Sequence, residues 1–106
     1  MKKIGVALLG LGVVGGGTYK ILTEKREYIR QNDGVDIEVR CVVEKNLERC
    51  KELGVDPSIV TTDIERVVSD PGISVVAEFF GGIEPAKSFL IKALEAGKSI
   101  VTANKE

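Results

Sequence analysis

The chain passes through Gly10-Leu11-Gly12-Val13-Val14-Gly15 between an apolar run, residues 4–9, and a segment whose apolar residues have helical spacing. In a strand-to-helix turn of this kind, the first glycine allows the tight turn, the second lets a pyrophosphate approach the backbone, and the third lets helix and strand pack closely. The unpaired amides of the first helical turn then bind the anion. The alternative is a purely structural turn. The surrounding pattern favours a dinucleotide site with Gly10, Gly12, Val13, Val14 and Gly15 as cofactor-binding residues.

Composition predicts one globular domain. The 106 residues are 43% hydrophobic and 29% charged, which is ordinary for a folded protein. Fifteen basic and sixteen acidic residues give a formal charge of −1 without a basic block, so we expect neither nucleic-acid nor membrane binding. The basic N-terminal start is too short for a signal or membrane segment, which predicts a cytoplasmic protein. Cys41 and Cys50 lack metal-site spacing and the chain has no histidine, so we expect buried thiols and no metal.

Hydrophobic periodicity predicts alternating strands and helices. Strands are expected over residues 3–9, 35–43, 59–61, 74–80 and 99–102. Helices are expected over residues 14–29, 46–53, 63–68 and 85–96. This alternation predicts an α/β fold, a Rossmann-like doubly wound parallel sheet of about five strands in the order 3-2-1-4-5. Residues 1–106 form one dinucleotide-binding domain in this interpretation.

The same patterns predict which side chains face the core. One long amphipathic helix should bury Val14, Thr18, Ile21, Leu22, Tyr28 and Ile29. The second strand should place on one side Ile37, Val39, Cys41 and Val43. The last helix should bury Phe89, Leu90, Ala93 and Leu94.

Polar candidates follow the strands at the edge where ligands bind to open parallel sheets. Glu44 ends the second strand and is the candidate for the adenosine ribose hydroxyls, although it lies 29 residues after Gly15 where about 20 is usual. The alternative is a solvated acid. Lys45 and Arg49 are cations suited to a 2′-phosphate, so the cofactor is NAD or NADP, with NAD modestly favoured.

Glu78 is an ionisable residue inside the apolar run 75–80 and needs a partner or an exit to solvent. Both a site role and a structural hydrogen bond are open for it. The chain has no nucleophile–histidine arrangement and no paired carboxylates spaced for acid–base catalysis. The residues therefore indicate a cofactor site without an evident catalyst.

Four blocks together resemble the N-terminal domain of homoserine dehydrogenase. They are Gly-Leu-Gly-Val-Val-Gly-Gly-Gly at 10–17, Asp-Pro-Gly-Ile-Ser-Val-Val-Ala-Glu at 70–78, Gly-Gly-Ile-Glu-Pro-Ala at 81–86 and Val-Thr-Ala-Asn-Lys at 101–105. The first block is generic, and the other three are specific in their order and spacing. The resemblance covers essentially the whole chain. In the family, a substrate and dimerisation region follows, and no part of this chain matches it.

The resemblance implies reversible NAD(P)-dependent hydride transfer between homoserine and aspartate semialdehyde, in the biosynthesis of amino acids such as threonine and methionine. It also implies a homo-oligomeric enzyme of which this chain alone is inactive. Gly81, Ala103, Asn104 and Lys105 match positions beside the cofactor, and Lys105 is the catalytic candidate. Many members carry an arginine near position 44, so Glu44 departs from the pattern and puts NADP use in doubt.

Two other functions fit the cofactor fold. One is a nucleotide-sensing module that regulates a partner, which the short chain favours. The other is the cofactor domain of a different amino-acid or sugar dehydrogenase, against which the block at 81–86 argues.

Overall fold

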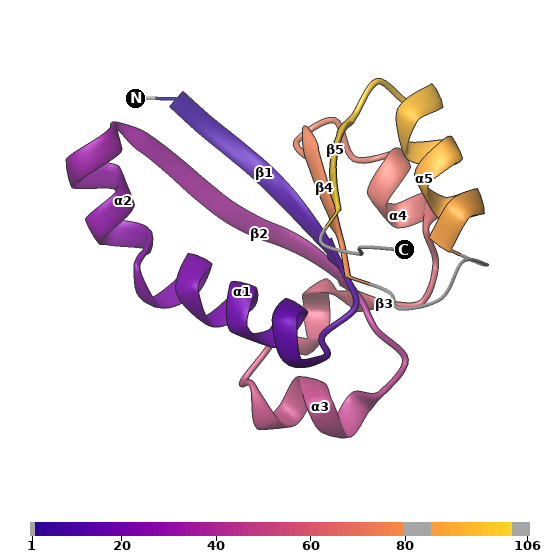
Figure 1. Ribbon diagram of the computed structural model, residues 1–106, viewed down its shortest axis with the longest axis horizontal. Helices are drawn as coiled ribbons and strands as arrows, with labels where there is room; N and C mark the ends of the chain where they lie inside the picture. The colour runs from indigo at the N-terminus through magenta and orange to yellow at the C-terminus, as the bar shows by residue number, and fades with distance from the viewer. Residues whose placement is uncertain (1, 80–85, 103–106) are drawn as a thin grey trace.

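The computed structural model describes residues 2–79 and 86–102, and in this part of the chain a parallel five-stranded sheet forms the centre (Figure 1). Its strand order is β3-β2-β1-β4-β5, which confirms the predicted order 3-2-1-4-5 and the Rossmann-like class. The strands are β1 Lys2–Leu9, β2 Val35–Val43, β3 Val60–Thr61, β4 Val75–Glu78 and β5 Ser99–Thr102.

Helices cover both faces of the sheet (Figure 1). On one side are α1 Val13–Glu24 and its continuation α2 Arg26–Asp33. On the other side are α4 Glu65–Val68 and α5 Ala86–Glu95. The connection between β2 and β3 contains α3 Leu47–Glu52 and the 3-10 turn Pro57–Ile59. None of the helices in the described ranges is long and apolar enough to cross a membrane.

Strand β1 supplies both halves of the core because its successive side chains point to opposite faces of the sheet. Val6 and Leu8 pack in the cluster under α1, whereas Ala7 and Leu9 pack in the cluster under α4 and α5. Ala7, Leu8 and Leu9 are fully buried. A central parallel strand buried on both faces is expected to be continuously apolar, and this one is.

The predicted single long helix is wrong, because the chain breaks between α1 and α2 at Lys25, whose ψ is 14°. Several apolar side chains that were predicted to be buried are exposed. Val14, Ile21 and Tyr28 are 57%, 59% and 64% exposed. Tyr19, instead, is the large apolar side chain of α1 that is buried. Leu94 on α5 is likewise exposed rather than inward.

The prediction that one face of β2 carries all four apolar side chains is wrong, because β2 has a bulge at Arg40. Val6 pairs with Val39 and Ala7 pairs with Cys41, so Arg40 is one extra residue on β2. An extra residue reverses the alternation of side chains. Ile37 and Val39 therefore lie on the α1 side, and Cys41 on the α4 side.

Arg40 joins β2 to the turn before β4. Its Nε and Nη2 donate to the Asp70 carboxylate at 3.0 and 3.2 Å. These bonds, together with that from the Gly72 N–H, hold the pKa of Asp70 below its usual value. The ion pair fixes the start of the 70–78 block against the sheet.

Replacing Asp70 with asparagine should destabilise the chain at pH 7 and have a shrinking effect as the pH falls. A carboxyl group with a lowered folded pKa contributes stability above its unfolded pKa of about 3.9 and loses it as the pH falls through the folded pKa. Urea unfolding of both proteins between pH 7 and pH 3 measures this, with Asp33→Asn at an exposed position of α2 as the control. A pH-independent difference between Asp70→Asn and the unmodified chain would contradict the assignment.

Candidate functional site

The glycine turn lies at the carboxyl end of β1, and each of its three glycines has a different structural reason. Gly10 has a φ of +102°, in the left-handed region that favours glycine. A side chain on Gly15 would collide with the Gly10 carbonyl oxygen, so Gly15 permits the close approach of α1 to the turn. A Cβ on Gly12 would meet no atom of residues 2–79 and 86–102 within 4 Å. The space above Gly12 is therefore open to a ligand.

The first turn of α1 presents unpaired amides to this open space. Gly12 is the N-cap, and no side chain in the described part of the chain caps the helix. The first helical bond runs from the Gly16 N–H to the Gly12 carbonyl at 2.7 Å. Val13 and Val14 are 89% and 57% exposed beside these amides. A helix N-terminus of this kind attracts an anion, and the exposed valines offer apolar surface to the rest of the ligand.

Glu44 follows β2 and contacts the glycine turn directly. Its Oε1 accepts a hydrogen bond from the Leu11 N–H at 2.7 Å, and its Oε2 accepts one from the Asn46 N–H at 2.9 Å. A carboxylate has about four acceptor positions, so these two bonds leave capacity for ribose hydroxyls. The structure thus brings together Glu44 and the turn, as predicted from their places at neighbouring strand ends.

Arg49 on α3 also reaches the turn, which sequence reasoning missed. Its Nε donates to the Leu11 carbonyl at 2.6 Å, and its Nη2 donates to the Gly12 carbonyl at 3.2 Å. Its Nη1 donates to Glu52 at 3.3 Å. The guanidinium therefore has three protein acceptors, whereas Lys45 is exposed beside Glu44.

Comparisons with known proteins identify the family of this site. Residues 10–106 match the family model described as homoserine dehydrogenase, NAD binding domain. The chain belongs to this family. It is 45% identical over 105 residues to the homoserine dehydrogenase of Methylobacillus glycogenes and 39% identical over 106 residues to that of Bacillus subtilis. These alignments include 99% and 100% of this chain but 26% and 24% of the two relatives.

Solved structures of homoserine dehydrogenases have the same fold. The Staphylococcus aureus enzyme at pH 7.5 superposes with a TM-score of 0.88 at 35% identity, and the Thiobacillus denitrificans enzyme with 0.86 at 42% identity. The match includes 99% and 100% of this chain, and 26% and 24% of those chains. The chain thus spans about a quarter of the length of the relatives it matches. Its cofactor is NAD(P), as the family implies.

The remaining predicted residues of this homoserine dehydrogenase domain follow β4 and β5. Gly81, Ala103, Asn104 and Lys105 lie outside the described residues. The ends of the two strands that precede them are in register with the end of β1, because Leu9 pairs with Glu78 and Glu78 pairs with Thr102.

Glu78 makes a structural hydrogen bond at this edge. Its side chain is 2% exposed, and its Oε1 accepts from the Thr102 hydroxyl at 2.6 Å. Its Oε2 is buried without a hydrogen-bond partner in the described part of the chain. The bond between Glu78 and Thr102 ties β4 to β5 at this edge.

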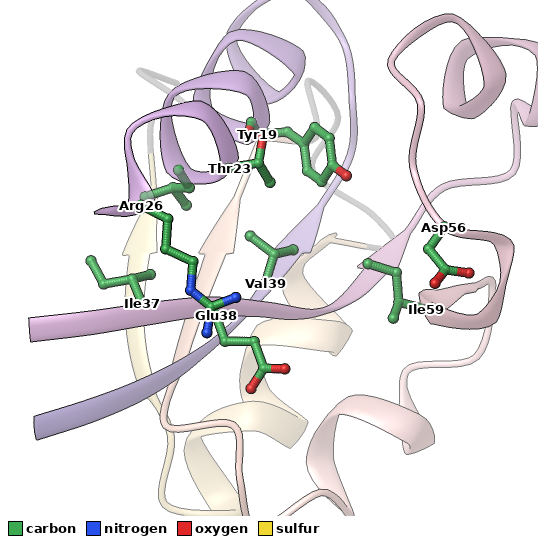
Figure 2. A pocket seen from close by; sticks show the side chains of 9 residues that line it. Tyr19, Thr23, Arg26, Ile37, Glu38, Val39, Asp56 and Ile59 are labelled. Atoms are coloured by element: carbon green, nitrogen blue, oxygen red, sulfur yellow. Dashed lines mark hydrogen bonds between the residues drawn. The ribbon is translucent and has the colours of Figure 1, made fainter. Parts of the chain in front are cut away.

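A groove of about 280 Å³ lies along α1, apart from the glycine turn (Figure 2). Tyr19 from α1 and Asp56 before β3 line it, and burial, followed by the nearby Asp56 charge, raises the pKa of Tyr19. Its charged groups have internal partners. Arg26 is bonded to Asp36 at 2.7 Å and Asp56 accepts from the Ser58 N–H at 2.9 Å. Because Arg26 and Asp56 already have partners within the protein, the groove is not a candidate for the cofactor site.

The predicted buried thiols are confirmed. Cys41 and Cys50 are both buried and free. Burial raises the pKa of each thiol, which keeps it protonated and unreactive at neutral pH. Among the residues described, no group of histidine, cysteine or acidic side chains has the arrangement of a metal site.

Proposed function

We propose that this chain binds the nicotinamide dinucleotide for an oxidoreductase that interconverts homoserine and aspartate 4-semialdehyde. The observation that carries the proposal is the open space over Gly12, faced by uncapped helix amides and flanked by Glu44. Residues 1–106 form the dinucleotide domain in this proposal. Substrate binding requires a further region, and the relative from Methylobacillus glycogenes is long enough to contain one, because this chain aligns with 26% of it. The chain alone is inactive.

Each residue of the site has a defined task in this proposal. The Val13, Val14 and Gly15 amides hold the pyrophosphate, and Gly12 leaves room for it. Glu44 accepts from the ribose hydroxyls. The bound cofactor supplies hydride exchange, and the protein supplies its orientation. Gly81, Ala103 and Asn104, which the resemblance places beside the cofactor, complete its binding.

Lys105 is the proposed catalytic residue, on the basis of the resemblance. A lysine ammonium beside the substrate oxygen stabilises the charge that changes there during hydride transfer. The proton donor itself comes from the region outside this chain. The complete enzyme is a cytoplasmic homo-oligomer in this proposal, without nucleic-acid or membrane partners, and the free thiols suit a reducing compartment.

Calorimetry tests the binding function. The 106-residue chain should bind one NADH per molecule and should not reduce NAD in the presence of homoserine. Absence of binding by a folded chain would refute the proposal, and homoserine oxidation by the chain alone would refute the need for a further region. A nucleotide-sensing module would instead fail to support any turnover when fused in place of the corresponding quarter of the Bacillus subtilis homoserine dehydrogenase.

Glu44 also makes the site favour NAD over NADP. The Glu44 carboxylate repels a 2′-phosphate, whereas it accepts from the ribose hydroxyls of NAD. Replacing Glu44 with glutamine keeps an acceptor for the Leu11 N–H and removes the charge. We expect the ratio of the NADP to the NAD dissociation constant to fall about tenfold, equivalent to about 1.4 kcal/mol.

The matched control is Glu48→Gln, an exposed carboxylate in the first turn of α3. This control should leave the ratio of the two dissociation constants unchanged. Tighter binding of NADP than of NAD to the unmodified chain would contradict the preference.

A further inference from the structure

Arg49 holds two consecutive carbonyls of the glycine turn, those of Leu11 and Gly12, from a helix 38 residues further along the chain. In a trans peptide the N–H points opposite to the C=O. Fixing the Leu11 carbonyl therefore fixes the direction of the Gly12 N–H, and fixing the Gly12 carbonyl fixes that of the Val13 N–H. Both N–H groups must then face away from Arg49.

Glu44 restrains the preceding peptide in the same way. Its carboxylate accepts from the Leu11 N–H at 2.7 Å. Leu11 itself has a fully buried side chain. The Glu44 carboxylate thus holds an N–H group of the turn, the Arg49 guanidinium holds two of its carbonyls, and the buried Leu11 side chain anchors it in the core. Three peptide planes have defined orientations before any ligand arrives, which lowers the ordering cost of binding.

Gly16 makes room for Arg49. A Cβ on Gly16 would lie 2.5 Å from Arg49 Nη2 and 3.3 Å from its Cζ. By contrast, a Cβ on the adjacent Gly17 would meet none of the described residues within 4 Å. The dinucleotide fingerprint needs the glycine at position 15 and sets no requirement at 16. The guanidinium of Arg49 is the main obstacle to a side chain at position 16, and Leu53 Cδ1, at 3.3 Å from the added Cβ, is a lesser one.

We infer that Arg49 is a positioning residue for the dinucleotide, and that Gly16 is a glycine because Arg49 occupies the place of its side chain. By holding the Leu11 and Gly12 carbonyls, Arg49 directs the Gly12 and Val13 N–H groups to the pyrophosphate. Its charge also polarises these two peptides, which strengthens their N–H groups as donors. This task and the bond to Glu52 use three of the five guanidinium N–H groups. The inference rests on the proposed function.

Replacing Arg49 with methionine should weaken NADH and ADP binding about tenfold each, because both ligands carry the pyrophosphate. Gly16→Ala should give a similar loss by displacing Arg49. In the Arg49→Met background, Gly16→Ala should cause no further loss of affinity and should raise the unfolding temperature, since alanine is a better helix former than glycine. Gly17→Ala is the control, and it should leave both affinities unchanged.

Nitrogen-15 NMR of the ligand-free chain provides a second readout. The Gly12 and Val13 amide signals should shift in Arg49→Lys, which has a single donor group for two carbonyls. The inference is overturned if the folded Arg49→Met variant binds NADH as tightly as the unmodified chain, or if the affinity losses of Arg49→Met and Gly16→Ala add. If the unmodified chain does not bind NADH, the proposed function itself has failed, which is a distinguishable result.

Discussion

Replacing Gly12 with valine is expected to weaken NADH binding by the 106-residue chain at least 100-fold. The valine side chain would occupy the space over the turn, where the pyrophosphate must approach the backbone. Within 4 Å of the added Cβ, this space contains no atom of the residues that the structure describes. Loss of a preferred N-cap costs the helix about 1 kcal/mol, so the variant should remain folded. Calorimetry gives the affinity, and circular dichroism gives the unfolding temperature.

Gly17→Val is the matched control for this experiment. Gly17 lies in the same helix, and a Cβ there also meets open space. We expect its NADH affinity to remain within about twofold of that of the unmodified chain, because position 17 lies one turn beyond the amides that face the pyrophosphate. A folded Gly12→Val variant with unchanged affinity would move the cofactor away from the glycine turn.

Replacing Lys105 with alanine should lower turnover at least 100-fold and change the NAD dissociation constant less than threefold. The test uses this domain fused in place of the corresponding quarter of the Bacillus subtilis homoserine dehydrogenase, to which it is 39% identical. An ammonium that contacts the substrate oxygen acts mainly in the transition state, so its loss appears in kcat rather than in cofactor binding. Steady-state kinetics and NAD titration measure the two effects.

Lys92→Ala provides the control in the same fusion. Lys92 lies on α5, where its Nζ bonds to Glu65 at 3.3 Å on the outer surface. Its removal should leave kcat unchanged. An undiminished rate in the Lys105→Ala fusion would remove this lysine from the proposed mechanism.

The strand order was predictable because each strand of this chain carries a clear signal. A continuously apolar β1 indicates a central strand, and alternating strands and helices allow few topologies. The break at Lys25 was not predictable, because lysine is a good helix former and no glycine or proline marks the position. The bulge at Arg40 was equally hidden, since the apolar alternation from Ile37 to Val43 continues through it.

The site was predictable to the extent that it lies at strand ends. Glu44 and the glycine turn follow neighbouring parallel strands, and the structure places them in contact. The bonds from Arg49 to the turn depend on the course of α3 relative to α1, which periodicity does not specify. The extra glycine at position 16 was the available signal for this contact, because the fingerprint does not require it.

Binding of the cofactor at the glycine turn is tested by titrating the nitrogen-15-labelled chain with NAD and following the amide chemical shifts. We expect the largest shifts at the Gly12, Val13 and Val14 amides and a smaller shift at Glu44. Shifts confined to the groove between Tyr19 and Asp56, or no shifts at millimolar NAD, would contradict it.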